Sequence, residues 1–149
     1  MNKINKVIFV AASGTARAPM AAAIFTNFSL SRNIIGESRG LVVQFPEPIN
    51  QKVEAVLIGN GIVLSDFASQ KLEEDDFTND TLIIAMEEKQ RQKILECYDR
   101  ATEENTVVLS TFVGDELEIM DPYGAPIQTY GLCYEVLKSS IEKLINIIV

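Results

Sequence analysis

The residues whose types and spacing could do chemistry lie in one short stretch of this sequence, VAASGTARAP at Val10–Pro19. Arg17 offers a planar guanidinium group that can hold two oxygens of the same anion. The residues before it are small enough for their backbone N–H groups to approach that anion, and they are Ala12, Ser13, Gly14, Thr15 and Ala16. The stretch therefore predicts a loop that binds phosphate or another oxyanion.

Two elements must position this loop. The apolar run Lys6–Val10 is typical of a strand buried on both faces. Pro19 suits the first turn of a helix, where its missing N–H group has no partner to lose. A loop that leads from a strand into a helix N-terminus gathers backbone N–H groups and the positive end of the helix dipole. The loop lacks the Gly-Lys-Ser/Thr end of a Walker A motif and the spaced glycines of a dinucleotide loop.

The rest of the chain alternates between strand and helix patterns. Further strands are expected near Ile34–Ser38 and at Thr81–Met86 and Asn105–Ser110. Helices are expected at Gln51–Gly61, with Asn50 as the N-cap, and at Glu87–Arg100 and Thr129–Ile148. This order predicts a single α/β domain over residues 1–149, with three layers: a four-stranded parallel sheet and helices on both of its faces. In such sheets, ligands bind at the carboxyl ends of the strands, where the loop lies.

The composition excludes several classes of function. The chain has 13 Lys and Arg against 21 Asp and Glu, a formal net charge of −8, which argues against nucleic-acid and anionic-membrane partners. It contains no histidine, so every imidazole mechanism and histidine-bound metal is excluded. Cys97 and Cys133 are expected to pack in apolar surroundings, and we predict no metal and no cofactor. No secretion signal or membrane span is recognisable, which predicts a cytoplasmic protein.

The sequence resembles the low-molecular-weight protein tyrosine phosphatases and their arsenate-reductase relatives. That family has a Cys-x5-Arg-Ser loop after a hydrophobic strand, followed by Pro-Met-Ala and a helix. Here Arg17 is followed by Pro19, Met20 and Ala21 at the matching positions. The later segment MDPYGAPIQTYGLCYEVL resembles the family's Asp-Pro-aromatic-Gly motif and final helix, so the resemblance spans nearly the whole chain.

The resemblance implies a role for each matching position. In the family, the loop cysteine attacks phosphorus as a thiolate, and the loop arginine holds the phosphate oxygens, which assigns the latter role to Arg17. The late aspartate acts as general acid and then as general base, a role that falls on Asp121. Tyr123 matches the aromatic residue that lines the substrate cleft. Six positions before Arg17, however, the nucleophile position holds Ala11.

Other parts of the cysteine machinery are absent as well. Ala18 replaces the serine that supports the thiolate, Gly14 replaces a frequent loop asparagine, and Ala16 replaces a second loop cysteine. We therefore predict a pseudophosphatase that binds phosphate, a phosphorylated protein or another small anion, as a monomer or weak homodimer. Two alternatives stay open: weak hydrolysis by water or Ser13 with Asp121 as acid and base, or an engineered replacement of the nucleophile in an active phosphatase.

A pair of acidic residues follows the third predicted strand. Glu87 and Glu88 are expected to open a helix, where their charges favour the helix dipole. They are also expected near the rim of the cleft, where they would repel an acidic phosphopeptide.

Overall fold

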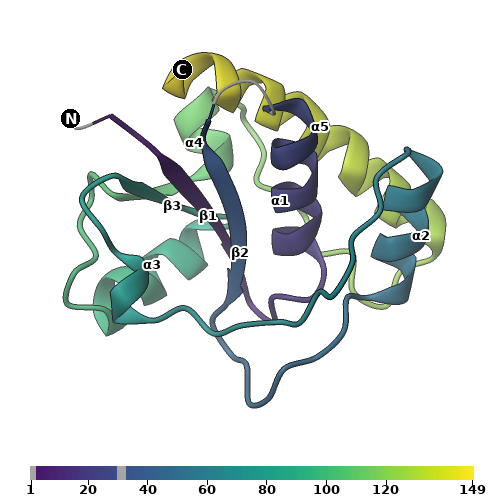
Figure 1. Ribbon diagram of the computed structural model, residues 1–149, viewed down its shortest axis with the longest axis horizontal. Coiled ribbons are helices and arrows are strands. Elements are labelled where there is room, and N and C mark those ends of the chain that lie inside the picture. The colour runs from purple at the N-terminus through teal and green to yellow at the C-terminus, as the bar shows by residue number, and fades with distance from the viewer. Residues whose placement is uncertain (1–2, 30–32) are drawn as a thin grey trace.

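The computed structural model describes residues 3–29 and 33–149. The elements follow in the order β1 (Lys6–Ala11), α1 (Arg17–Phe28), β2 (Ile35–Gly40), α2 (Gln51–Gly59), a short 3-10 helix (Glu74–Asp76), β3 (Thr81–Ala85), α3 (Glu88–Cys97), β4 (Thr106–Val108), α4 (Leu109–Val113) and α5 (Ile127–Ile148). The four strands form one parallel sheet in the order β2-β1-β3-β4. Helices cover both faces of this sheet, so the predicted three-layer α/β fold is confirmed (Figure 1).

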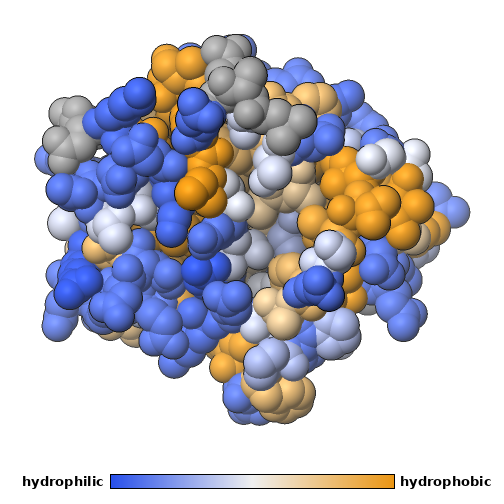
Figure 2. All heavy atoms as spheres, viewed as in Figure 1, coloured by the Kyte–Doolittle hydropathy of each residue, from blue (hydrophilic) through white to orange (hydrophobic). Residues whose placement is uncertain are grey.

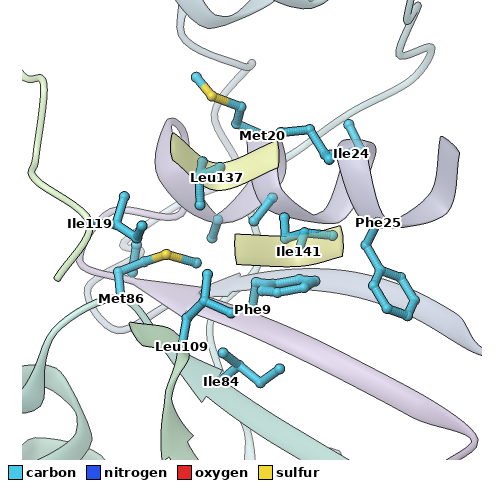
Figure 3. Packing of buried hydrophobic residues seen from close by; sticks show 14 of the residues in the cluster. Phe9, Met20, Ile24, Phe25, Ile84, Met86, Leu109, Ile119, Leu137 and Ile141 are labelled. Carbon is cyan, nitrogen blue, oxygen red and sulfur yellow. The ribbon is translucent and has the colours of Figure 1, made fainter. Parts of the chain in front are cut away.

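The two faces of the central strand β1 build two separate cores. Phe9 packs on the side of α1 and α5, where its ring meets the ring of Phe25 edge-on at 5.9 Å between centroids. Ile8 and Val10 pack on the other side, against Ile94 of α3. Figure 3 shows the larger core, in which side chains from α1, α5 and the sheet interdigitate. Because both faces of β1 are buried, the end of β1 has a fixed position from which the loop starts.

The helix boundaries follow local chemistry. Helix α1 begins at Arg17, two residues before Pro19, so Pro19 lies in the first turn as predicted. Asn50 caps α2: its side-chain oxygen accepts hydrogen bonds from the N–H groups of Lys52 at 2.9 Å and Val53 at 3.2 Å. The predicted N-cap is therefore confirmed.

The fourth strand is shorter than predicted. Asn105–Ser110 was expected to be extended, but only Thr106–Val108 pairs with β3. Leu109 instead begins α4, a helix that ends at Val113 and is capped by Gly114 in a left-handed conformation with φ of 84°. Leu109 is fully buried in the core beside α5, so packing against that helix outweighs the strand propensity of the local sequence.

Two further expectations concern the cysteines and the surface. Cys133 is buried on α5 as expected, but Cys97 is exposed at the end of α3, so the expectation of packing was wrong for Cys97. Among the described residues, no helix is both long enough and apolar enough to cross a membrane. Figure 2 shows hydrophilic residues over much of one face and a hydrophobic patch on the side of α2.

Candidate functional site

The loop between β1 and α1 lies at the carboxyl edge of the sheet, at the lower end of the strands in Figure 1. It packs closely against the end of β2, where Ala11 pairs with Gly40. Gly14 has φ of 74°, and a Cβ atom there would lie 2.8 Å from the backbone nitrogen of Gly40. A side chain at position 14 would therefore be both strained and obstructed. Glycine at position 14, in place of the family's frequent asparagine, therefore allows the loop backbone to lie this close to the backbone of Gly40.

The backbone carbonyls and N–H groups of the loop differ in whether they have hydrogen-bond partners within the chain. The carbonyls of Ala11 and Ala12 accept hydrogen bonds from the N–H group of Leu41 at 3.0 and 2.9 Å, and the carbonyl of Thr15 accepts one from Asn50 at 2.9 Å. In the part of the chain that the structure describes, one loop N–H group has an acceptor: the N–H group of Thr15 donates to Ser13 Oγ at 3.4 Å. Three loop carbonyls are therefore engaged by flanking segments, whereas most loop N–H groups make no hydrogen bond among the described residues and remain available to an anion.

The N-terminus of α1 belongs to the same arrangement. Ala16 occupies the N-cap position and has no side-chain hydrogen-bonding group to offer the first turn. The first N–H groups of a helix have no partner within the helix. Together with the helix dipole, they favour negative charge at this end of α1.

The base of the loop carries no nucleophile. Ala11 is 4% exposed and Ala18 is fully buried, so two methyl groups stand where the family resemblance implies a thiolate and its supporting hydroxyl. Ser13 is exposed, and its Oγ lies 2.9 Å from Thr15 Oγ1. Because a threonine hydroxyl is not a base, this contact does not activate Ser13 as a nucleophile.

Arg17 is almost completely buried, at 3% exposed, and one edge of its guanidinium is already occupied. Its Nη1 donates to Glu87 Oε1 at 2.9 Å and to the backbone carbonyl of Ile119 at 2.8 Å. Its Nη2 lies 3.8 Å from Asp121 Oδ2. The structure thus brings Arg17 and Asp121 together from opposite ends of the chain, and Nη1 is fixed by two acceptors.

Asp121 and Tyr123 lie together on the loop before α5. Asp121 is half exposed, and its Oδ1 accepts a hydrogen bond from the N–H group of Tyr123 at 3.1 Å. Tyr123 is 86% exposed. With Lys52 and Tyr130, it lines an open pocket of about 440 Å³ between α2 and α5. The ring is therefore exposed beside Asp121, on a pocket that none of the loop residues 11–17 lines.

Glu87 and Gln90 have roles in the site that the sequence did not predict. Glu87 was expected to favour a helix dipole, but its carboxylate forms the ion pair with Arg17. Gln90, one turn further along α3, donates from Nε2 to the same Glu87 oxygen at 3.1 Å. The spacing of three residues that joins Glu87 to Gln90 was a readable signal. The contact of Glu87 with Arg17, seventy positions away, had no local signal.

Cys133 is the cysteine that lies near this cluster, and it is unsuited to replace the missing nucleophile. Its Sγ lies 3.9 Å from the carbonyl oxygen of Met120. Burial raises the pKa of Cys133 to about 11, although Arg17 opposes this change and Asp121 adds to it. The thiolate is the reactive form of cysteine, so Cys133 remains an unreactive thiol at neutral pH.

Comparisons with known proteins agree with this fold. The family model of the low molecular weight phosphotyrosine protein phosphatases matches residues 6–148. The chain is 30% identical over 141 residues to a protein-arginine-phosphatase of Geobacillus stearothermophilus, with 93% of each chain covered. It is 28% identical over 139 residues to the low molecular weight protein-tyrosine-phosphatase PtpB of Staphylococcus haemolyticus, covering 93% of this chain and 96% of the relative. A crystal structure of a low molecular weight protein tyrosine phosphatase from T. tengcongensis superimposes with a TM-score of 0.88 at 30% identity, covering 95% of this chain and 97% of the other.

These findings place the chain in the low molecular weight phosphotyrosine protein phosphatase family. They confirm the resemblance inferred from the sequence. A phosphate group or phosphorylated protein is accordingly the class of ligand that the family binds.

Proposed function

We propose that this protein is a pseudophosphatase that binds a phosphate or phosphoprotein through the loop Ala12–Arg17 and does not hydrolyse it. The observation that carries the proposal is the loop itself. The carbonyls of Ala11, Ala12 and Thr15 are engaged by the flanking segments, and most of the loop N–H groups have no acceptor among the described residues, so they are available to an anion. Binding and cysteine chemistry depend on different atoms, so the first can persist without the second.

The loss of the nucleophile has a large expected cost. Removing the nucleophile of a hydrolase lowers turnover by on the order of a millionfold. Neither Ser13 nor Cys133 compensates, because the hydroxyl beside Ser13 is not a base and Cys133 remains protonated. We therefore expect no hydrolysis of an aryl phosphate above the rate without protein.

The names of the relatives suggest two phosphorylated side chains as ligands to test. One is named a protein-arginine-phosphatase and another a protein-tyrosine-phosphatase. Phosphotyrosine and phosphoarginine are thus both suitable ligands for a binding assay. A cytoplasmic location, a single domain over 1–149 and a monomer or weak homodimer stay predictions that accompany this proposal.

The central experiment is a calorimetric titration of the protein with inorganic phosphate. We expect wild type to bind and Arg17→Ala to lose binding, because the fork that holds two phosphate oxygens is gone. Arg17→Lys keeps a positive charge without the fork, so it separates weaker recognition from unfolding. Arg100→Ala is the control, since Arg100 is an exposed arginine that pairs with Asp75. Equal phosphate affinity in wild type and Arg17→Ala would overturn the assignment of the loop.

Turnover must be measured in parallel. Hydrolysis by wild type that disappears in both Ser13→Ala and Asp121→Asn would replace this proposal with the weak-phosphatase alternative. Binding of phosphate without hydrolysis supports the pseudophosphatase.

A further inference from the structure

Carboxylates crowd the mouth of the loop around Arg17. Glu87 pairs with Arg17 Nη1, and Asp121 lies 3.8 Å from Nη2. The N–H group of Glu88 donates to the carboxylate of Glu118 at 2.6 Å, which places these two acids beside the same helix start. We call these four residues the acidic rim: Glu87, Glu88, Glu118 and Asp121. Glu87 and Asp121 thus contact the cation that is expected to hold a phosphate, and Glu88 and Glu118 lie beside Glu87 at the start of α3.

Gln90 provides an independent sign that the Glu87 carboxylate is held in this place. The side chain of Gln90 is buried, at 4% exposed, and its Nε2 donates to Glu87 Oε1. Among the described residues, Gln90 Oε1 is the buried side-chain oxygen without a hydrogen-bond partner. A buried acceptor without a donor is costly. If the Gln90 amide were rotated by half a turn, its Oε1 would face the Glu87 carboxylate oxygen and repel it. The amide therefore keeps the orientation in which Nε2 donates to Glu87 and Oε1 has no partner.

The four carboxylates of the rim outnumber by one the three cations that pair with them, Arg17, Lys89 and Arg91. Arg17 brings one positive charge to the site, and Glu87 already accepts a hydrogen bond from it. Lys89 and Arg91 are themselves paired, with Glu87 at 3.5 Å and with Glu88 at 2.8 Å. A phosphate that reaches the loop therefore enters surroundings that repel further negative charge and attract positive charge.

An exposed aromatic ring stands next to the rim. Tyr123 follows Asp121 by two residues and donates its N–H group to that carboxylate. Aromatic faces attract Lys and Arg side chains, and carboxylates form charge-assisted hydrogen bonds with them. Asp121 and the face of Tyr123 are therefore suited to contact a basic side chain, next to a pocket that one cation, Lys52, also lines.

We propose that the ligand of this loop is a basic phosphopeptide, in which lysine or arginine flanks the phosphorylated residue. This inference rests on the proposed function, because it assumes that the loop holds the phosphoryl group. The loop then binds the phosphate while the acidic rim and Tyr123 bind the basic flanks. An acidic phosphopeptide is excluded by repulsion from the same carboxylates.

The experiment compares three phosphotyrosine peptides with the same central residue and with basic, neutral or acidic flanks. Exposed ion pairs each contribute about twofold in affinity, so three or four of them give the basic peptide roughly a tenfold advantage over the neutral one. The acidic peptide should bind more weakly than the neutral one. Raising the ionic strength should reduce these differences, because salt screens exposed charges.

Variants assign the preference to the rim. Glu118→Gln and Glu88→Gln should each lower the advantage of the basic peptide by about twofold. Glu96→Gln is the matched control, since Glu96 is an exposed acid near the other end of α3 and should leave the advantage unchanged. Thermal unfolding of each variant shows whether the fold is kept.

The outcomes separate this inference from the proposed function. If none of the three phosphotyrosine peptides binds, the inference fails, while the titration with inorganic phosphate decides the proposed function separately. Equal binding of the three peptides overturns the inference and leaves the proposed function in place. An unphosphorylated basic peptide that binds as well as its phosphorylated form also overturns it, because the net charge of −8 alone would then explain the attraction.

Discussion

Glu87→Gln should change stability and phosphate affinity in opposite directions. In the present structure the Glu87 carboxylate accepts from Arg17 Nη1 at 2.9 Å and from Gln90 Nε2 at 3.1 Å. The glutamine side chain has nearly the same shape, and its carbonyl oxygen can accept from the same donors. The substitution therefore removes one negative charge while it preserves the hydrogen-bond geometry around Arg17.

The loss of stability follows from the burial of Arg17. Removing one partner of a buried ion pair costs about 3–5 kcal/mol when the other charge is left uncompensated. Here the substituted amide would still accept a hydrogen bond from Arg17, and Asp121 remains near Nη2. We expect a smaller cost of about 1–3 kcal/mol, which lowers the melting temperature of a chain of this size by roughly 5 °C.

The gain in affinity follows from the removed repulsion. A phosphate held by the far edge of the guanidinium fork would lie about 7 Å from the Glu87 carboxylate. At an effective dielectric constant of about 40, two like charges at that distance repel by ~1.2 kcal/mol. Glu87→Gln should therefore bind inorganic phosphate about tenfold more tightly.

The assay is calorimetry with inorganic phosphate, together with thermal unfolding in its absence. Glu96→Gln serves as control, because it removes a charge from the exposed surface of α3, near the end of that helix opposite to Glu87. Weaker phosphate binding by Glu87→Gln would refute the electrostatic reasoning. It would show that Glu87 aids binding by fixing Arg17 more than it opposes binding by its charge.

Three further predictions concern the loop and the thiols. Ala11→Cys combined with Ala18→Ser should give aryl-phosphate hydrolysis that wild type lacks, measured as release of the phenol, whereas no gain would show that the surrounding loop no longer supports thiolate chemistry. Gly14→Ala should lower the free energy of unfolding by about 1–3 kcal/mol and weaken phosphate binding, because its methyl group meets backbone at 2.8 Å in a left-handed conformation; unchanged melting and affinity would contradict that. Alkylation near neutral pH, followed by mass spectrometry, should modify Cys97 and spare Cys133. Burial raises the pKa of Cys133 to about 11, so its thiolate becomes abundant only as the pH approaches that value. Rapid modification of Cys133 at neutral pH would disprove its burial.

Much of the fold was predictable because its signals are local. The apolar run before the loop, Pro19 in the first helical turn and the Asn50 cap each act within a few residues. Leu109 was misassigned because strand-forming residues continue past the last paired position, and the packing of that residue under α5 decides the outcome. Propensity carries no information about such a distant partner.

The candidate site was predictable to a different extent. The family resemblance implied that Arg17 and Asp121 act at one site, and the structure places Arg17 Nη2 3.8 Å from Asp121 Oδ2. The hydrogen bond from Arg17 Nη1 to Glu87 was not predictable. Two acidic residues at the start of a helix are already explained by their favourable interaction with the helix dipole, so nothing in the sequence indicated a distant partner. Only the three-dimensional arrangement shows that this carboxylate faces Arg17 and that Gln90 supports it.

Anion binding and phosphoryl transfer depend on different parts of this loop, which is why one can be lost without the other. Under the proposed function the phosphate is held by the loop N–H groups, whose path is set by the left-handed Gly14, by the start of α1 and by Arg17. None of these features depends on a side chain at position 11, where the methyl group of Ala11 is buried with the core. A thiolate at that position would be an added buried charge that the fold must stabilise. Under the proposed function, a methyl group at this position removes that demand and leaves the loop N–H groups and Arg17 to bind phosphate, so selection on binding alone would maintain the site as it stands.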